Sequence, residues 1–341
     1  MPTGTPEQNK MPQGLKAMGE TDTVAVLGAG VIGSSWAALF LASGRRVHVY
    51  DANSDTVPTV TDYIDNAWPV LETLGLTEHG DRSNIAFHKT AAKAVENAGF
   101  VQESVPERID IKHRLYQEIE PVLNQGAIVA SSASGLMLKE LQQGWKRPSR
   151  LILGHPFNPP HLIPLVELVS NDLTEDGVIE DAEAFYQSVG KVTIRVKREV
   201  PAHVANRLQA ALWREAIHLV ETGVASVEDV DKAVWAGPGL RWAAMGPHML
   251  FHLGAGAGGL QEFCSRYADS FHRWWDDLGE VNLSPETIQS LVAGINEETG
   301  GEEPKAMSAT RDQLITEFLK GRSRVGMKLE EPSRQPTAQE I

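Results

Sequence analysis

Short apolar runs alternate with longer amphipathic segments through the first two hundred residues. The run at 23–27 (TVAVL) is apolar at successive positions, which is typical of a strand buried on both faces of a parallel sheet. Alternating strands and helices predict an α/β fold whose N-terminal part is a Rossmann-type, doubly wound sheet. We expect strands at 23–27, 46–50, 100–103, 127–132, 151–154, 164–169 and 192–196, with helices at 34–43, 109–122 and 176–188.

The pattern changes after Pro201, a residue type that is well tolerated in the first turn of a helix. From there to about 321 the spacing of apolar residues is mostly helical. We therefore expect two domains, a Rossmann domain over 21–200 and a smaller all-helical domain over 201–321. Within the second domain the pattern predicts helices at 202–222, 226–236 and 306–320.

The two ends of the chain carry no such pattern. Residues 1–20 are polar and have no apolar centre, so they do not resemble a signal peptide. Residues 322–341 are polar and include two prolines. We expect both segments to be disordered.

Composition narrows the classes of function. The 341 residues carry a formal net charge of −14, which is poorly suited to sequence-independent binding of nucleic acid. Cys264 is the single cysteine, so an intramolecular disulfide is excluded and a reducing cytoplasm is expected. No run reaches the roughly 18–20 apolar residues of a membrane helix. We expect a soluble cytoplasmic protein that binds a small molecule, without nucleic-acid or membrane partners.

A glycine-rich loop follows the first predicted strand and opens the next helix. Gly28 permits a tight turn, Gly30 lets a pyrophosphate approach the backbone, and Gly33 lets helix and strand pack closely. The free N–H groups at the start of the helix favour phosphate. The residues predicted to bind a dinucleotide here are Gly28, Gly30, Val31, Ile32 and Gly33.

Asp51 ends the second predicted strand, 18 residues beyond Gly33. Its carboxylate would accept hydrogen bonds from the adenosine ribose and repel a 2′-phosphate, which favours NAD over NADP. FAD is the alternative for this loop, but the chain lacks an apparent flavin-specific second half. The other alternative is a tight turn in a protein that binds no nucleotide.

His155 and Glu167 are the strongest candidates for catalysis. His155 follows the strand predicted at 151–154, at the edge where ligands bind in α/β sheets. Glu167 lies inside an apolar strand, where a carboxylate needs a partner. A His–Glu pair would orient the imidazole and favour its protonated form.

Taken together, the motifs resemble the 3-hydroxyacyl-CoA dehydrogenase family over roughly residues 22–300. The family's hallmark is a strand-end His-Pro-x-Asn-Pro followed by an apolar strand carrying glutamate. The chain is most similar to the short branch acting on free acids, which contains L-carnitine dehydrogenase and L-gulonate 3-dehydrogenase (lambda-crystallin). The matching segments are 102–107 (QESVPE), 131–134 (SSAS), 154–159 (GHPFNP), 164–167 (PLVE), and 199–201 (EVP) leading to 206–208 (NRL).

The resemblance implies roles for four catalytic residues. His155 would be the general base that removes the hydroxyl proton as hydride leaves for NAD, and Glu167 would orient it. Ser134 and Asn206 would hydrogen-bond the reacting oxygen. A histidine is more often an ordinary surface or buried polar residue than a base, and Ser134 could be a turn serine or Asn206 a helix-surface amide. No metal is expected.

The resemblance also implies further cofactor contacts. Glu103 and Glu107 would line the nicotinamide side, although both could instead be solvated loop residues. Lys112 is a predicted cofactor contact whose alternative is helix surface.

The substrate is less legible than the reaction. Arg241 could pair with a substrate carboxylate, and Trp242 could flank it or attract a trimethylammonium group, unless it only fills a domain interface. Segments 66–69 (NAWP) and 212–216 (LWREA) resemble the carnitine enzyme, whereas 252–253 (HL) and 263–267 (FCSRY) resemble the gulonate enzyme. A 3-hydroxyacyl-CoA thioester is the alternative substrate, although no basic cluster for its 3′-phosphate stands out between 54 and 100.

A structural role of the lambda-crystallin kind, without catalysis, is a remote alternative. The predicted helical domain is rich in apolar side chains and predicts a homodimer in which these helices pair. The tryptophans that suggest this pairing are Trp235, Trp242, Trp274 and Trp275.

Overall fold

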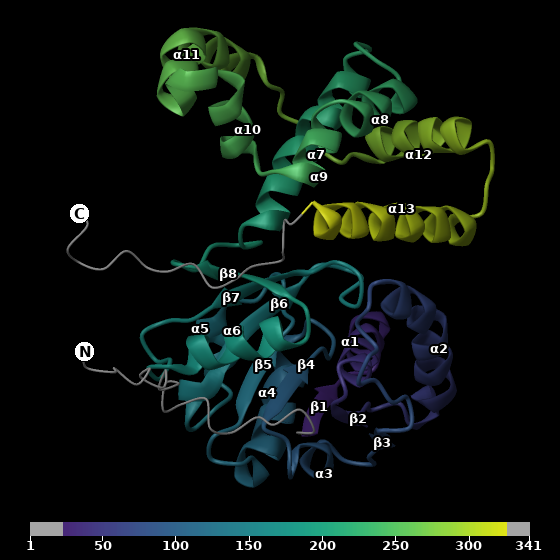
Figure 1. Cartoon of the computed structure of the whole chain (residues 1–341), viewed down its shortest axis with the longest axis vertical. Helices are drawn as coiled ribbons and strands as arrows, with labels where there is room; N and C mark the ends of the chain where they lie inside the picture. Colours follow the sequence, from purple (N-terminus) through teal and green to yellow (C-terminus); the bar gives the residue numbers. More distant parts are fainter. Residues whose placement is uncertain (1–22, 326–341) are drawn as a thin grey trace, which may run out of the picture. The chain divides into compact units, whose positions relative to one another are not determined.

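A computed structural model describes residues 23–325 and contains an eight-stranded sheet with helices on both faces, followed by a group of helices (Figure 1). This confirms the predicted fold class. The strands are β1 (Thr23–Leu27), β2 (Arg46–Tyr50), β3 (Ile85–Phe87), β4 (Phe100–Glu103), β5 (Ile128–Ser131), β6 (Leu151–Pro156), β7 (Leu165–Val169) and β8 (Val192–Val196).

The sheet has the order β3-β2-β1-β4-β5-β6-β7-β8, and its strands from β3 to β6 are parallel. The order reverses direction between β1 and β4, and in sheets of this kind ligands bind at the carboxyl edge beside such a reversal. β7 runs antiparallel to β6, and β8 is parallel to β7. The reversal at β7 brings β6 and β7 together as neighbours joined by a short connection.

Apolar residues on both faces of the sheet explain its two layers of helices. One layer consists of α1 (Val31–Ala42), α2 (Val57–Thr73) and α6 (Val178–Ser188), and its core includes Trp36 and Phe100. The other consists of α3 (Ala91–Val95), α4 (Ile109–Ile119) and α5 (Leu138–Gln142). Strands such as β1 are therefore buried on both sides, as their apolar runs predict.

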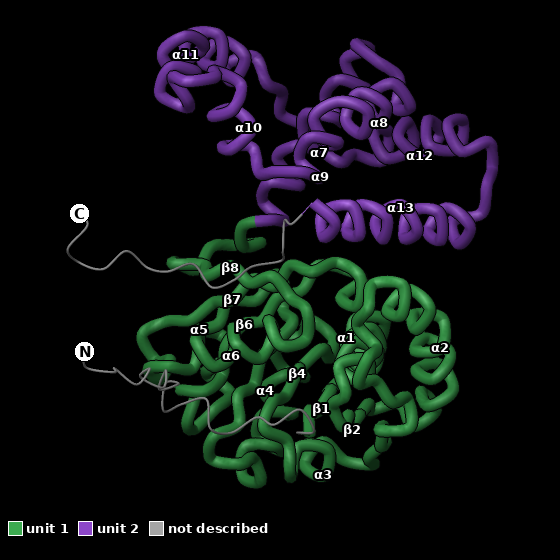
Figure 2. Tube along the Cα trace, in the orientation of Figure 1, with its two compact units in different colours: residues 1–204, 327–341 green, residues 205–326 purple. Residues whose placement is uncertain are grey.

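The chain divides into two compact units between Val204 and Ala205 (Figure 2). Unit 1 contains the sheet. Unit 2 contains α7 (Ala205–Glu221), α8 (Val227–Ala236), α9 (Pro238–Ala244), α10 (Pro247–Gly254), α11 (Gly259–Asp277), α12 (Pro285–Thr299) and α13 (Pro304–Arg324). The boundary lies close to the expected one near 200, and the last helix continues past the expected end at 321.

The helix expected to start just after Pro201 begins later, because a turn occupies 201–204. Ala202 and His203 adopt left-handed backbone conformations there, with φ of 62° and 50°. Several further elements lie outside the ranges predicted from the sequence, among them β3 and α2. β3 is only three residues long, and α2 contains Pro69 in its interior. The segments expected to be disordered, 1–20 and most of 322–341, lie outside the described residues.

Unit 2 has little interior of its own. Among its described residues, Ile217 and Val230 are the only large apolar side chains that are buried. Between residues 23 and 325, no helix combines the length and apolar character needed to cross a membrane.

A buried lysine holds the connection between β6 and β7. Lys191 is 4% exposed, and its Nζ donates to the carbonyl of Pro160 and, at 2.8 Å, to that of Ile163. The same nitrogen lies 4.9 Å from the centroid of the Trp36 ring. Burial lowers the pKa of Lys191 to about 7. The neutral amine still has two N–H groups, one for each carbonyl.

Lys191→Met is expected to change how stability depends on pH. The pKa falls from an ordinary 10.5 to about 7 on folding, so between these values the unfolded chain binds more protons and the free energy of unfolding rises with pH. Methionine has no such group, so the free energy of unfolding of the wild type should rise relative to that of the variant from neutral toward alkaline pH. Urea unfolding at several pH values measures this, with Lys197→Met, an exposed lysine, as the control. Parallel pH curves for wild type and Lys191→Met would contradict the assignment.

Candidate active site

The glycine-rich loop between β1 and α1 has the geometry of a dinucleotide-binding turn. Gly28 has a φ of +91°, and a Cβ there would lie 2.6 Å from the backbone of Ser104 and Val105. A Cβ at Gly33 would lie 1.8 Å from the carbonyl oxygen of Gly28, whereas one at Gly30 would meet nothing within 4 Å. Gly28 and Gly33 are therefore required by the protein's own packing, and Gly30 leaves an open approach to the backbone.

Asp51 joins this loop at the end of β2. Its Oδ2 accepts a hydrogen bond from the backbone N–H of Ala29 at 2.6 Å, and its Oδ1 accepts one from Asn53 at 2.8 Å. The carboxylate thus lies beside the glycine loop, where it can accept ribose hydroxyls. With the N–H groups of Val31 and Ile32 at the start of α1, these residues fit the phosphate and ribose of a dinucleotide. Val31 is exposed, and Ile32 is partly buried against the core.

Glu107, in the loop after β4, binds the loop after β5. Its carboxylate accepts hydrogen bonds from the backbone N–H groups of Ser134, Gly135 and Leu136, and from the Ser134 hydroxyl at 2.9 Å. Partial burial alone would raise the pKa of Glu107, but these donors outweigh it and lower the pKa. The structure thus brings Glu107 and Ser134 together. Because the single Ser134 hydroxyl proton goes to Glu107 here, its predicted donation to a substrate oxygen stays a prediction.

Glu103 and Lys112 lie inside the domain. Glu103 is 0% exposed, and its carboxylate accepts from Lys112 Nζ at 2.6 Å and from the hydroxyls of Tyr116 and Ser131, each at 2.7 Å. Burial and the neighbouring Glu103 charge raise the pKa of Tyr116 well above its usual value. The expectation that Glu103 lines the nicotinamide side or lies in solvent is therefore wrong.

Lys112 also differs from expectation, since it is 1% exposed rather than on the helix surface. Its ammonium also donates to the carbonyl of Val105, at 3.3 Å. Through this bond, the buried side chain holds the loop that leads to Glu107 in place. Direct contact of Lys112 with a cofactor stays untested and would require it to leave these partners.

His155 and Glu167 meet across the antiparallel pair β6–β7, where their Cα atoms are register partners. His155 Nδ1 lies 2.8 Å from Glu167 Oε2, and the two side chains are 6% and 0% exposed. A carboxylate only accepts, so Nδ1 carries the hydrogen and Nε2 of the neutral ring has a free lone pair. The side chains pair as the sequence suggests, and their geometry is that of an oriented general base.

The second oxygen of Glu167 accepts a hydrogen bond from the backbone N–H of Val204 at 2.9 Å. This bond fixes the turn at 201–204, which places His203 beside His155, with ring centroids 5.0 Å apart. His203 is 3% exposed. Sequence reasoning missed His203, because it lies in a turn without periodicity and is close to His155 only through the sheet.

Asn206, Arg241 and Trp242 belong to unit 2, the first on α7 and the others on α9. Trp242 is 40% exposed. Arg241 makes no ion pair with any residue in the described range 23–325. The roles expected for these three residues stay predictions. Residues 23–325 contain no group of three His, Cys, Asp or Glu side chains suited to a metal ion.

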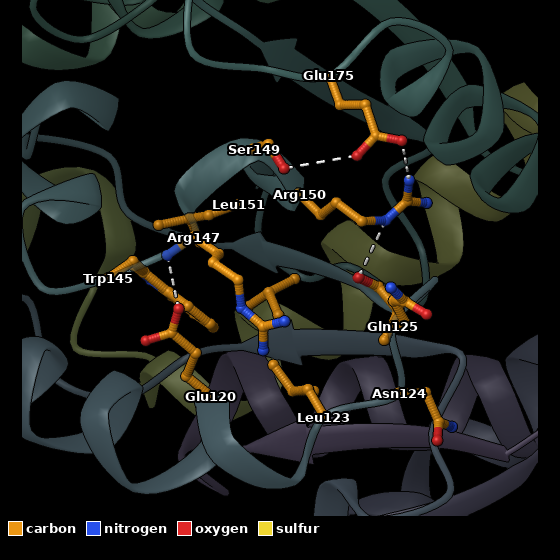
Figure 3. Close-up of a pocket in the computed structure, with 12 residues that line it drawn as sticks. Glu120, Leu123, Asn124, Gln125, Trp145, Arg147, Ser149, Arg150, Leu151 and Glu175 are labelled. Carbon is orange, nitrogen blue, oxygen red and sulfur yellow. Dashed lines mark hydrogen bonds and ion pairs between the residues drawn. The ribbon is translucent and has the colours of Figure 1, made fainter.

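A surface pocket lies at the other edge of the sheet, before β5 and β6 (Figure 3). The charged side chains of Glu120, Arg150 and Glu175 already have partners within the domain. Arg150 pairs with Glu175 at 3.3 Å, and Glu120 accepts hydrogen bonds from the backbone N–H groups of Lys146 and Arg147. None of the predicted site residues lines this pocket, which lies at the amino-terminal ends of the strands. The candidate site is at their carboxyl ends.

Comparison with known proteins agrees with this geometry. A family model described as "3-hydroxyacyl-CoA dehydrogenase, NAD binding domain" matches residues 23–200, and one described as "3-hydroxyacyl-CoA dehydrogenase, C-terminal domain" matches 203–289. The first model spans the glycine loop and Asp51. NAD is therefore the cofactor.

Curated relatives and a solved structure match most of the chain. L-carnitine dehydrogenase of Nocardiopsis dassonvillei is 42% identical over 86% of this chain and 89% of its own. That of Streptomyces coelicolor is also 42% identical, over 91% of this chain and 97% of its own. The structure of 5-formyl-3-hydroxy-2-methylpyridine 4-carboxylic acid 5-dehydrogenase, an NAD+-dependent dismutase, is 30% identical, with a TM-score of 0.76 over 88% of this chain and 99% of its own.

Two glycine substitutions should separate packing from cofactor binding. Gly33→Ala places a Cβ against the Gly28 carbonyl and should destabilise the protein by about 1–3 kcal/mol, although alanine in a helix is otherwise favoured by about 1 kcal/mol. Gly30→Ala meets no atom and should leave thermal stability unchanged while weakening NAD binding. Thermal unfolding and NAD titration measure both effects. Equal loss of stability in the two variants would contradict this reading of the loop.

Proposed function

Since the chain belongs to the 3-hydroxyacyl-CoA dehydrogenase family, we propose that it is an NAD-dependent dehydrogenase of free L-3-hydroxy acids, with L-carnitine as the first candidate substrate. The reaction oxidises a secondary alcohol beta to a carboxyl group to the 3-keto product. The observation that carries the proposal is the buried pair of His155 and Glu167.

The pair accounts for the proton in this reaction. When bound, NAD accepts the hydride from the carbon that bears the hydroxyl. His155 Nε2, the free lone pair of the ring, takes the hydroxyl proton. Glu167 holds the opposite nitrogen and stabilises the imidazolium that forms. Ser134 and Asn206 would hydrogen-bond the reacting oxygen and stabilise the charge that develops on it.

Unit 1 supplies the residues that would hold the dinucleotide. The glycine loop and the start of α1 would bind the pyrophosphate, and Asp51 would accept the ribose hydroxyls. Glu107 would position the nicotinamide end through the loop after β5. Lys112 would act from beneath, by fixing the loop that leads to Glu107.

A charged free acid fits two side chains of α9. Arg241, which has no ion-pair partner in residues 23–325, would bind the substrate carboxylate in a bidentate manner. The exposed Trp242 ring would attract a trimethylammonium group through a cation–π contact.

The carnitine-like and gulonate-like segments have local structural explanations. Trp68, in the carnitine-like segment 66–69, is buried in the core of unit 1. In the gulonate-like segments, His252 Nδ1 accepts a hydrogen bond from the backbone N–H of Leu260. Phe263 stacks on Phe251, with ring centroids 4.7 Å apart. Trp68, His252 and Phe263 thus have packing roles within their own units. The relatives named L-carnitine dehydrogenase favour carnitine over gulonate and over a CoA thioester.

His155→Ala should abolish most of the activity. NADH formation is followed at alkaline pH, which draws off the proton released by the reaction, with L-carnitine, L-gulonate, L-3-hydroxybutyrate and L-3-hydroxybutyryl-CoA. We expect turnover of L-carnitine and a loss of roughly 10²–10⁴-fold in the variant, the usual contribution of a general base. Glu167→Gln should also lower kcat, because the imidazolium loses its counter-charge.

His79→Ala, at an exposed histidine of unit 1, is the matched control and should keep full activity. Turnover of the thioester alone would contradict the proposal of a free-acid substrate but would be consistent with the proposed roles of His155 and Glu167. NAD binding without turnover of any of the four compounds would favour a structural role.

We also propose that the protein is a cytoplasmic homodimer formed through unit 2. The described part of unit 2 buries few apolar side chains, and large ones remain exposed on several helices. A unit of this size with so small an interior needs another apolar surface to be stable. The exposed thiol of Cys264 suits a reducing compartment. Large exposed side chains of this surface include Trp235, Trp274, Trp275, Ile288, Val292 and Phe318.

Sedimentation at micromolar concentration should find a dimer. Trp274→Ser with Trp275→Ser removes two rings that are 55% and 60% exposed and should shift the population toward monomer. Lys232→Gln, which alters only an exposed helix ion pair, should not. A wild-type protein that sediments only as a monomer would refute the dimer.

A further inference from the structure

His203 is a buried imidazole that the proposed reaction leaves without a role. Its ring packs against His155 with centroids 5.0 Å apart and an interplanar angle of 54°. Both side chains belong to unit 1 and are nearly inaccessible to solvent. A proton taken up by His155 is therefore held in the interior of the protein.

The backbone that carries His203 is strained. Ala202 and His203 are the only non-glycine residues with positive φ between 23 and 325. Such conformations cost about 1–3 kcal/mol each and persist where the surroundings impose them. Here the bond from Val204 N–H to Glu167 imposes the turn, and Glu167 is also the partner of His155. One carboxylate therefore positions both imidazoles.

The hydrogen bonds of His203 determine where it can accept a proton. Its Nε2 lies 3.3 Å from the carbonyl oxygen of Ala133, so this nitrogen carries the hydrogen. Nδ1 of the neutral ring then has a lone pair. This atom is buried and has no hydrogen-bond partner among residues 23–325. The ring that packs against His155 thus has one nitrogen without a hydrogen-bond partner.

Burial is the main factor that favours the neutral form of His203. Burial lowers the pKa of His203, and so does repulsion from His155. The Ala133 carbonyl and the carboxylates of Glu167 and Glu199 act in the opposite direction and are outweighed. An imidazole with a lowered pKa accepts a proton transiently and releases it easily to water.

We propose that His203 is the proton outlet of the active site, a role that rests on the proposed function of His155. Oxidation of the alcohol produces a ketone, NADH and one proton, which binds His155 Nε2. The N–H bond at His155 then breaks and one forms at His203 Nδ1, through a bridging water molecule. His155 regains its lone pair. The N–H bond at His203 Nδ1 then breaks, its proton passes to a solvent water molecule, and the neutral ring bonded to the Ala133 carbonyl is restored. His203 acts through His155 and does not touch the hydride.

His203→Gln tests this role. Glutamine keeps an amide N–H near the Nε2 position for the Ala133 carbonyl but cannot be protonated. In a single turnover with the substrate that the activity assay identifies, NADH should form at close to the wild-type rate, because His155 can still take one proton. Steady-state kcat in dilute buffer at neutral pH should fall by roughly tenfold or more, with KM unchanged. Added imidazole should restore kcat, and the defect should shrink at alkaline pH.

Two controls separate this role from others. His113→Gln changes a histidine whose Nε2 also bonds a backbone carbonyl, that of Glu140 at 2.8 Å, and it should have no effect. His155→Ala should lose the single turnover as well as the steady state. If His203→Gln slows both equally in every buffer, or slows neither, the relay is refuted. A wild-type protein that forms no NADH would refute the proposed function and the relay with it.

Discussion

The site depends on one buried charge, the carboxylate of Glu167. It lies in the middle of β7 with no exposure to solvent, and both of its oxygens accept hydrogen bonds. One oxygen fixes the tautomer of His155 on β6, and the other fixes the turn that precedes α7. Removing a partner would leave a buried charge uncompensated, at a cost of several kcal/mol. The strand pair, the base and the entry to unit 2 are thus held by the same group.

Features determined by neighbouring residues could be predicted from the sequence. The glycine loop, Asp51 and the apolar strands depend on local conformation and burial, and each occurs where the pattern places it. The partner of Glu167 was also within reach, because an acidic residue in an apolar strand needs one and His155 is twelve residues away. The antiparallel pairing of β6 and β7 could not be predicted, because the sequence pattern indicates that both strands belong to an alternating parallel series.

Features determined by distant residues could not be predicted. Glu103 ends β4 and Glu107 lies four residues further on, in the loop that follows, yet only Glu107 remains at the surface. What separates them is the set of donors around Glu103, which comes from α4 and β5. The turn at 201–204 differs from the expected helix because Glu167 captures the Val204 N–H. Proline at 201 is compatible with either outcome, so the sequence alone does not decide.

The binding of Glu107 to three consecutive backbone amides has a consequence for the motion of the loop after β5. Amides of an exposed loop ordinarily exchange their hydrogens with water one by one, whereas these three share a single acceptor group. They should open together, as one cooperative unit. Because the pKa of Glu107 is lowered, the carboxylate stays charged to a lower pH than an ordinary glutamate. The loop carrying Ser134 then remains a preformed surface rather than one assembled on each encounter with a ligand.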